Sequence, residues 1–370
     1  MREPMGKHPR QPLPTSYRAR RTGGFAAALM LAGGFTVALV LALALPETAA
    51  AAALPSVDSS ARYEITEIDM PAGVTAGPIA GVDAAGVVAG VGYETSNDDP
   101  DCLYYDGASL QDFNFNSGNW CHFTGLTARG VAVGQYYDFG NYANYAVLYA
   151  QGQFSEVDHT IIDSLLDVGA GGLAVGNLPA GIFGAYKVAT GKVAYALYDA
   201  KEQCRISFPY AVNSRGVVLA YDQCRNGRTR YETVANDVFT YFQPPHGFVV
   251  VDQGVRPVFN GLGQIVIHKN GSGHAYLWST SGGRPLDLGT LAEDPNGTYE
   301  ATGLTDTLAT GITSDGYSWL WTAKDGMRNL AALLPENSYG WIQPQSVDAQ
   351  GDLGCITSAS TSTWLYLHRR

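Results

Sequence analysis

The segment Gly81-Val82-Asp83-Ala84-Ala85-Gly86, with a short apolar run that ends at Gly90, decides the fold because it recurs along the chain. Six further copies of this pattern end at Gly134, Gly176, Ala220, Ile267, Gly311 and Gly354. Successive end points lie 42 to 47 residues apart. One blade of a β-propeller holds four strands in about 40–50 residues. The spacing therefore predicts an all-β, seven-bladed β-propeller.

Each clear copy of the pattern has the composition of a tight turn. Asp or Asn occupies the first turn position and Gly the fourth; the first-position residues are Asp83, Asn213, Asn260 and Asp348. A short polar side chain caps the backbone of such a turn, and Gly adopts the conformation at its exit. A ring of these side chains could also bind cations. The turn alone requires these residue types, so the structural interpretation is favoured.

The remainder of each period predicts a second, aromatic-rich hairpin. The clearest pairs of segments are 103–105 with 110–113, 146–149 with 154–157, 276–278 with 286–288, and 319–321 with 327–330. Apolar and polar residues alternate in these segments, which is typical of half-buried strands. Each period therefore supplies the four strands of one blade.

The two ends of the repeat region predict that the ring is closed. The seventh copy is followed by a third strand, 363–368, but by no fourth strand before Arg370. Residues 62–69 precede the first copy and contain an alternating strand sequence. If this segment pairs with the last strand, two exposed sheet edges disappear. We therefore expect residues 62–69 to complete the last blade of a single propeller domain, 54–370.

Composition and charge exclude several classes of protein. Charged residues make up 15% of the chain, against about 25% in a typical soluble domain, and apolar residues make up 46%. This balance argues against a disordered chain or a coiled coil. The whole chain has a net charge of −11, and residues 1–53 carry six basic and two acidic side chains. The remaining residues therefore have a net charge of −15. Such an acidic body would repel a phosphate backbone, so we expect no nucleic-acid partner.

The N-terminal segment has the pattern of a bacterial secretory signal peptide. Residues 23–45 are uncharged, follow Arg18, Arg20 and Arg21, and precede the Ala-rich segment 49–53. A basic region, an apolar region and small residues at the exit are typical of a cleaved signal over residues 1–53. An uncleaved anchor is the alternative, because the apolar region is long enough to span a bilayer. We expect a secreted or periplasmic protein with no membrane contact after cleavage.

Residues 273–291 carry a resemblance to a known family. They contain Gly-His-Ala-Tyr-Leu-Trp at 273–278 and Leu-Asp-Leu-Gly-Thr-Leu at 286–291. These motifs resemble the extracellular HAF repeat family, with Tyr276 in place of the family's Phe. The turn copies resemble the Gly-Ile-Asn-x-x-Gly segment of that family, and residues 317–335 are similar to a further unit. The resemblance implies a secreted, strand-rich repeat protein, and it implies no reaction.

The five cysteines predict disulfides in an oxidising compartment. Cys204 and Cys224 flank the turn at 213–216 almost symmetrically, so we expect them to face each other across a hairpin. Their spacing from the turn differs by one residue, so a bulge must shift one strand, and Pro209 suits that place because it cannot donate a hydrogen bond. Cys102 and Cys121 form the second candidate pair, in successive blades. Cys355 follows Gly354 on an inner strand, so we expect a buried free thiol there.

No sequence motif predicts a metal, a cofactor or a catalytic centre. His268 and His274 flank a turn and could face each other across a hairpin, but two ligands do not make a zinc site. The acidic loop 97–101 lacks the ligand spacing of a calcium loop. Nucleophile elbows, phosphate loops and dinucleotide fingerprints do not occur in the sequence. We therefore expect no metal and no cofactor.

Two segments are candidate ligand-binding loops. The first is a loop rich in aromatic residues and amides, whose candidate residues are Tyr136, Tyr137, Tyr142 and Tyr145. Amphipathic rings beside amides suit the faces and hydroxyl groups of sugars. The second is a basic loop, whose candidate residues are Arg225, Arg228 and Arg230. Arginine side chains suit carboxylates or phosphates, although packing between blades and pairing with nearby acids would explain the same residues. Propeller topology predicts that both loops lie on one face, two blades apart.

The sequence favours a non-enzymatic extracellular binding module, acting as a monomer, with a glycan or cell-surface polymer as its ligand. The rival interpretation is a secreted lyase or hydrolase that acts on polysaccharide through carboxylates and arginines at the propeller mouth. A third is a purely structural surface protein. One scaffold hosts many functions, so the fold alone does not decide among them.

Overall fold

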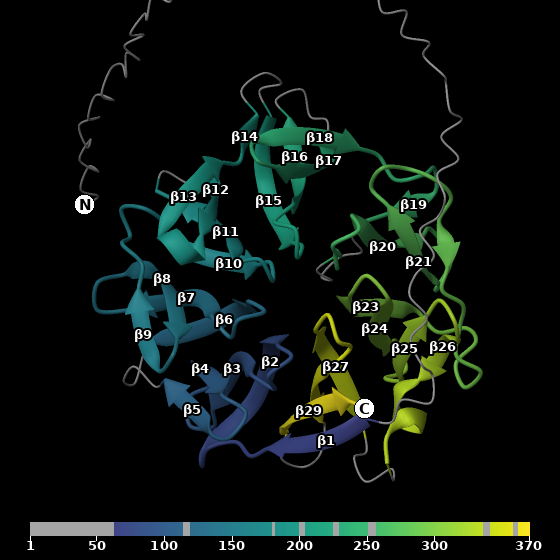
Figure 1. Ribbon diagram of the computed structural model, residues 1–370, viewed down its shortest axis with the longest axis horizontal. Coiled ribbons are helices and arrows are strands. Elements are labelled where there is room, and N and C mark those ends of the chain that lie inside the picture. The colour runs from purple at the N-terminus through teal and green to yellow at the C-terminus, as the bar shows by residue number, and fades with distance from the viewer. Residues whose placement is uncertain are drawn as a thin grey trace, which may run out of the picture. The chain divides into compact units, whose positions relative to one another are not determined.

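The computed structural model describes residues 63–113, 119–179, 182–199, 204–224, 229–250, 257–335, 341–357 and 362–370. These residues form seven antiparallel sheets, which are the seven blades of a β-propeller (Figure 1). The predicted fold class is therefore confirmed. The predicted signal peptide, residues 1–53, lies outside the described residues. In the part of the chain that is described, no helix is long and apolar enough to cross a membrane.

Strands are given from the innermost to the outermost in each blade. Blade 1 contains β2 (Val74–Val82), β3 (Val88–Glu94), β4 (Pro100–Tyr105) and β5 (Leu110–Phe113). Blade 2 contains β6 (Trp120–Leu126), β7 (Ala132–Asp138), β8 (Ala143–Ala150) and β9 (Gln153–Glu156). Blade 3 contains β10 (Ser164–Val168), β11 (Leu173–Leu178), β12 (Ile182–Lys187) and β13 (Lys192–Ala196), with the 3-10 helix η1 (Val188–Thr190) before β13.

The remaining blades follow the same order. Blade 4 contains β15 (Cys204–Val212), β16 (Val218–Cys224), β17 (Thr229–Ala235) and β18 (Val238–Phe242), preceded by the short β14 (Tyr198–Asp199). Blade 5 contains β19 (Phe248–Val249), β20 (Gln264–Lys269), β21 (Ala275–Ser279) and β22 (Leu286–Asp287). Blade 6 contains β23 (Tyr299–Leu304), β24 (Leu308–Thr313), β25 (Ser318–Thr322) and β26 (Gly326–Asn329), and the 3-10 helix η2 (Leu330–Leu333) follows it.

Blade 7 combines both ends of the propeller. Its order is β27 (Ile342–Val347), β28 (Leu353–Thr357), β29 (Trp364–Arg369) and finally β1 (Tyr63–Ile68). Strand β1 pairs antiparallel with β29 from Tyr63 opposite Arg369 to Ile68 opposite Trp364. Figure 1 shows β1 lying along the outside of this blade. The predicted closure by the N-terminal strand is confirmed.

The inner turns, which join the first and second strands of the blades, have the predicted caps. The Asp83 carboxylate accepts hydrogen bonds from the backbone N–H groups of Ala85 and Val87 at 2.9 and 3.0 Å. Asn213, Asn260 and Asp348 accept equivalent pairs of bonds, and Gly86 at the exit has a φ of 82°. These side chains therefore serve the turns, as the sequence predicted.

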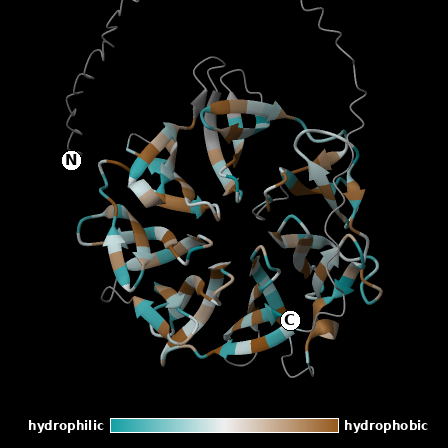
Figure 2. Ribbon diagram, viewed as in Figure 1, coloured by the Kyte–Doolittle hydropathy of each residue, from teal (hydrophilic) through white to brown (hydrophobic). Residues whose placement is uncertain are grey.

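The hydrophobic core lies between the blades. One cluster joins Cys102 and Tyr104 of blade 1 to Phe123 and Tyr149 of blade 2, and clusters of this kind recur between neighbouring blades. Figure 2 shows hydrophobic and hydrophilic residues interleaved along the blades. The alternation therefore supplies each blade with apolar side chains for the blades on both sides.

The topology defines two faces of the propeller. The inner turns lie on one side, which we call the turn face. The connections between second and third strands, and those from one blade to the next, lie on the opposite side, which we call the loop face. The candidate aromatic loop connects β7 to β8, the second and third strands of blade 2, so it belongs to the loop face. The candidate basic loop, 225–228, lies outside the described residues, so its place on this face stays a prediction.

Candidate functional site

An exposed aromatic cluster lies on the loop face of blade 2. Trp120 at the start of β6 contacts Phe139, with ring centroids 4.9 Å apart, and Phe139 contacts Tyr137 at 4.5 Å. The Trp120 and Phe139 side chains are 41% and 37% exposed. Strand register explains the grouping, because Trp120 is the partner of Tyr137 and alternation places the two side chains on the same face of the sheet. We call these three rings, together with Tyr142 in the loop that carries Phe139, the aromatic cluster.

The loop that carries the cluster is held by local hydrogen bonds. The Asp138 carboxylate accepts bonds from the N–H groups of Gly140 and Asn141, and the Asn119 side chain accepts a bond from Phe139 N–H. Tyr142, at the tip of the loop, has a φ of 51° and is 81% exposed. Burial does not account for a large aromatic ring at this position, so Tyr142 is available to a ligand.

The aromatic cluster extends onto blade 1. The Trp120 indole Nε1 donates a hydrogen bond of 2.9 Å to the carboxylate of Asp99, in the loop that joins β3 to β4. Asn97 in the same loop donates to the other carboxylate oxygen of Asp99. Amide and carboxylate groups therefore border the exposed rings, and this combination suits a ligand with apolar faces and hydroxyl groups.

The structure separates the four predicted aromatic residues. Tyr137 and Tyr142 belong to the exposed cluster, whereas Tyr136 is 9% exposed and its hydroxyl accepts a hydrogen bond from Asn119. Tyr145 is half-buried and packs against Tyr136, with ring centroids 6.1 Å apart. Sequence reasoning did not select Trp120, although its register with Tyr137 would have indicated it. Tyr136 and Tyr145 therefore contribute to packing in blade 2.

The basic candidates are divided in a similar way. Arg225 and Arg228 lie outside the described residues, so their part in a site stays a prediction. Arg230 Nε lies 3.6 Å from a carboxylate oxygen of the buried Asp222, and its guanidinium lies 3.5 Å from the ring centroid of Tyr241. Arg230 is therefore held within blade 4 by a carboxylate and an aromatic face.

A buried carboxyl pair lies in blade 1, close to the aromatic cluster. Asp101 on β4 is 3% exposed, and Asp112 lies on the neighbouring strand β5. Each has one buried carboxylate oxygen with no hydrogen-bond partner in the part of the chain that is described. Burial, reinforced by the negative charges of Asp112 and Glu94, raises the pKa of Asp101 to about 7. Burial also raises the pKa of Asp112.

This pair predicts that the protein loses stability as the pH rises from about 4 to about 7. The Asp101 carboxyl is ionised in the unfolded chain above about pH 4 but stays protonated in the folded protein until about pH 7, so the unfolded state loses its proton first. Asp101→Asn should flatten the decline between these values and be more stable than the parent protein at pH 8. Urea unfolding at a series of pH values measures the difference.

The matched control for this prediction is Asp106→Asn. Hydrogen bonds from Ser109 and Ala108 lower the pKa of Asp106, which is exposed. This variant should therefore keep the decline in stability between pH 4 and pH 7. Equal pH profiles for Asp101→Asn and the parent protein would contradict the assignment of the decline to Asp101.

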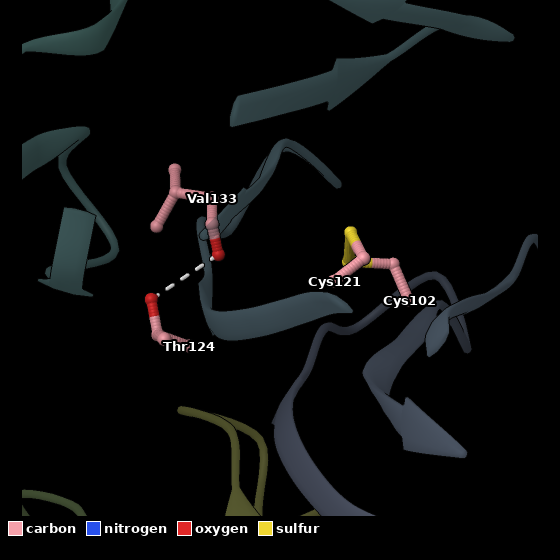
Figure 3. Close-up of a disulfide and its surroundings, with 4 residues drawn as sticks. All are labelled: Cys102, Cys121, Thr124 and Val133. Atoms are coloured by element: carbon pink, nitrogen blue, oxygen red, sulfur yellow. Dashed lines mark hydrogen bonds between the residues drawn. A yellow bond between two sulfur atoms is a disulfide. The ribbon is translucent and has the colours of Figure 1, made fainter. Parts of the chain in front are cut away.

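A disulfide joins the two blades beneath the aromatic cluster. Cys102 on β4 and Cys121 on β6 are bonded, and both are almost fully buried (Figure 3). Figure 3 also shows Thr124 on β6, whose hydroxyl donates to the carbonyl oxygen of Val133. The bond therefore fixes the first strand of blade 2 against blade 1, directly after Trp120. The predicted Cys102–Cys121 pair is present.

The other cysteine predictions have different outcomes. Cys204 and Cys224 are register partners on β15 and β16, as the sequence predicted. Two register shifts bring them together, one between Pro209 and Ala211, at the predicted place, and a second between Ile206 and Phe208, where the sequence predicted a single shift. The side chains of these two cysteines lie outside the described residues, so their bond stays a prediction. Cys355 is a buried free thiol, as expected.

Two adjoining cavities of about 560 and 450 Å³ occupy the centre of the ring. The larger is lined by residues at bulges of the innermost strands, which include Thr124, Leu166, Thr302 and Gln345. Asp167 and Glu300 also line it, and no Lys or Arg occurs among the described residues of either lining. The centre of the propeller is therefore acidic where the structure describes it.

The described residues contain no group of three or more His, Cys, Asp or Glu side chains arranged to hold a metal ion. His274, one of the two histidines considered from the sequence, places its Nδ1 3.0 Å from the carboxylate of Asp287 on β22. This contact joins the residue before β21 to β22 in blade 5. The interaction of His274 is therefore with an acid in its own blade.

Comparisons with known proteins support the fold but do not identify a family or a function. No family model matches the chain, and no curated protein matches it. One similar solved structure is the β-propeller domain of the Trilobed protease from Pyrococcus furiosus, which is described as having an open velcro topology. The match covers 79% of this chain and 95% of that one, at 10% identity and a TM-score of 0.52. A structure of streptogramin B lyase matches over 84% of this chain and 98% of its own, at 14% identity and a TM-score of 0.47. A structure of YCF48 bound to D1 peptide matches over 85% of this chain and 99% of its own, at 12% identity and a TM-score of 0.49. At these identities the similarity shows a β-propeller fold alone.

Proposed function

We propose that this protein is an extracytoplasmic interaction module that binds an uncharged, hydroxyl-rich polymer, such as a neutral glycan, through the aromatic cluster of blade 2. The observation that carries the proposal is the group of exposed rings at Trp120, Phe139 and Tyr142, bordered by Asp99 and Asn97. Aromatic faces pack against the apolar faces of sugar rings, while the polar groups at the border bind hydroxyls.

The charge around the cluster favours an uncharged polymer over an acidic one. Exposed Asp98 and half-buried Asp99 lie in the neighbouring loop of blade 1, and Asp138 lies at the base of the aromatic loop. The whole chain has a formal charge of −11. Carboxylates at this density repel a polyanion.

The proposed location outside the cytoplasm has two supports. One is the secretory pattern of residues 1–53. The other is the disulfide between Cys102 and Cys121, because such bonds persist in oxidising compartments. Membership of the HAF repeat family belongs to the same proposal and is supported by the motifs at 273–291.

The test is electrophoresis of the full-length chain through native gels that contain a neutral β-glucan, a xylan, a mannan or the polyanion polygalacturonate. We expect at least one neutral polymer to retard the protein and polygalacturonate to leave its mobility unchanged. Trp120→Ala combined with Tyr142→Ala should weaken the retardation about tenfold, because each lost aromatic contact is worth about 0.5–1.5 kcal/mol.

The matched control is Leu262→Ala. Leu262 is 39% exposed, similar to Trp120, but it lies in an inner turn and therefore on the turn face. This variant should be retarded as strongly as the parent protein. Unchanged mobility of the parent protein in all three neutral polymers would overturn the proposal, as would equal retardation of the Trp120/Tyr142 double variant.

A further inference from the structure

A second exposed tryptophan, Trp341, occupies the position in blade 7 that Trp120 occupies in blade 2. Each stands seven residues before the residue that caps the inner turn of its blade, which is Thr127 for Trp120 and Asp348 for Trp341. Each also comes directly before a buried residue at the start of the innermost strand, Cys121 or Ile342. The two indoles are therefore equivalent by repeat position, and both lie on the loop face.

The surroundings of the two indoles are also equivalent. Trp120 contacts the loop between β3 and β4 of blade 1 through Asp99. Trp341 lies against the loop between β24 and β25 of blade 6, so closely that a Cβ added at Gly316 would be 2.7 Å from the indole Nε1. The adjacent Tyr317 is 39% exposed and Trp341 is 36% exposed. Each indole therefore rests on the preceding blade and presents part of its ring to solvent, and the loop beneath Trp341 also carries the exposed Tyr317.

The other blades do not carry an aromatic residue at this position. By residue number, the equivalents in the described blades are Ala76, Ile162, Ile206 and Thr298, while the equivalent in blade 5 lies outside the described residues. An arrangement required by the fold alone would recur in every blade. Tryptophan occupies this position in blades 2 and 7, and blade 1 lies between these two blades in the ring (Figure 1).

We propose that Trp341 and Tyr317 form a second anchor for the same polymer, so that the loop face binds one extended chain across blades 6, 7, 1 and 2. This proposal rests on the function proposed above and specifies its substrate class as a long polymer. A short oligosaccharide would reach one anchor, whereas a long chain would reach both.

The polar groups near the two anchors fit an uncharged, hydroxyl-rich chain. The loop of blade 1 between the anchors presents exposed Asn97 and Asp98. The loop beneath Trp341 presents exposed Asp315. These groups accept or donate hydrogen bonds to hydroxyls, and the carboxylates repel polyanions.

Two linked contacts give a binding advantage that a single contact lacks. Once one anchor is occupied, the second binding event is intramolecular, and avidity can exceed the affinity of either anchor by about 10²–10⁴-fold. The second anchor should therefore raise the affinity for polymer while leaving the affinity for short fragments at the first anchor unchanged.

The experiment compares Trp120→Ala and Trp341→Ala in the full-length chain. Binding is measured to the neutral polymer that retards the parent protein most and to its disaccharide and trisaccharide fragments, by gel retardation and by fluorescence titration. We expect Trp341→Ala to weaken polymer binding at least about tenfold and to leave fragment binding at the first anchor unchanged. Trp120→Ala should weaken the binding of both. Leu262→Ala is the control, and circular dichroism checks that each variant is folded.

The outcomes separate the two proposals. If Trp341→Ala binds polymer as well as the parent protein while Trp120→Ala does not, the second anchor is overturned and the proposed function stands. If Trp341→Ala weakens polymer and fragments equally, the two-anchor arrangement is also overturned. If the parent protein binds none of the neutral polymers, the proposed function is overturned, and the second anchor with it.

Discussion

A variant that lacks residues 54–70 is expected to lose its soluble, monomeric state, because the deletion removes β1 and leaves blade 7 with three strands. Tyr63 and Ile68 are 3% and 2% exposed in β1. Burial of two such side chains contributes about 3–6 kcal/mol. The deletion also exposes the whole edge of β29, and an unpaired edge of this kind is a template for aggregation. Size-exclusion chromatography and thermal unfolding measure both effects.

The matched control removes only residues 54–62 and leaves β1 in place. This variant should elute as the parent protein does. A synthetic peptide of residues 62–70, added during refolding, should restore the soluble form of the 54–70 deletion. The closure of the ring would be contradicted as a source of stability if the 54–70 deletion stayed monomeric and unfolded at the same temperature as the control.

Removal of the Cys102–Cys121 disulfide is expected to have the second largest effect on the stability of the protein. The bond closes a loop with a sequence separation of 19 residues. In the chain-entropy account, a loop of this size corresponds to about 3 kcal/mol. Cys102→Ala combined with Cys121→Ala should therefore lower the free energy of unfolding by about this amount, measured by guanidinium unfolding without reductant.

Reductant provides the control for this prediction and also tests the other predicted bond. Cys355→Ala should remain as sensitive to dithiothreitol as the parent protein, because Cys355 is a free thiol. Any sensitivity that remains in the Cys102/Cys121 double variant would then come from a bond between Cys204 and Cys224. A double variant as stable as the parent protein in the absence of reductant would show that the Cys102–Cys121 bond does not contribute to stability.

The fold could be predicted from the sequence because the residues of the inner turns recur at a regular spacing. The inner turns of five described blades combine a capping side chain with a Gly of positive φ, so copies such as those at Asp83 and Asp348 remain recognisable in the sequence. The register shift near Pro209 followed from the need to bring Cys204 opposite Cys224, whereas the second shift, between Ile206 and Phe208, was not predicted. Local backbone requirements of this kind can be inferred from residue spacing.

The candidate site was predicted only in part, because exposure depends on how blades pack together. Tyr136 and Tyr137 are neighbours in the sequence, but alternation directs Tyr136 into the core between blades 1 and 2 and leaves Tyr137 beside Trp120. The contact of Trp120 with Asp99 spans 21 residues and two blades. Arg230 lies opposite Asp222 in the strand register, which explains why this arginine is paired within its blade.

The arrangement of β1 against β29 has a mechanical consequence. The first residue of β1, Tyr63, is the partner of Arg369, so both chain ends leave the pair at the same end. A force applied between the two ends would therefore pull perpendicular to the strands and load the hydrogen bonds one pair at a time. If tension is applied through the termini, blade 7 should open by unzipping at low force, while the other six blades, whose strands are joined by hairpins, remain folded.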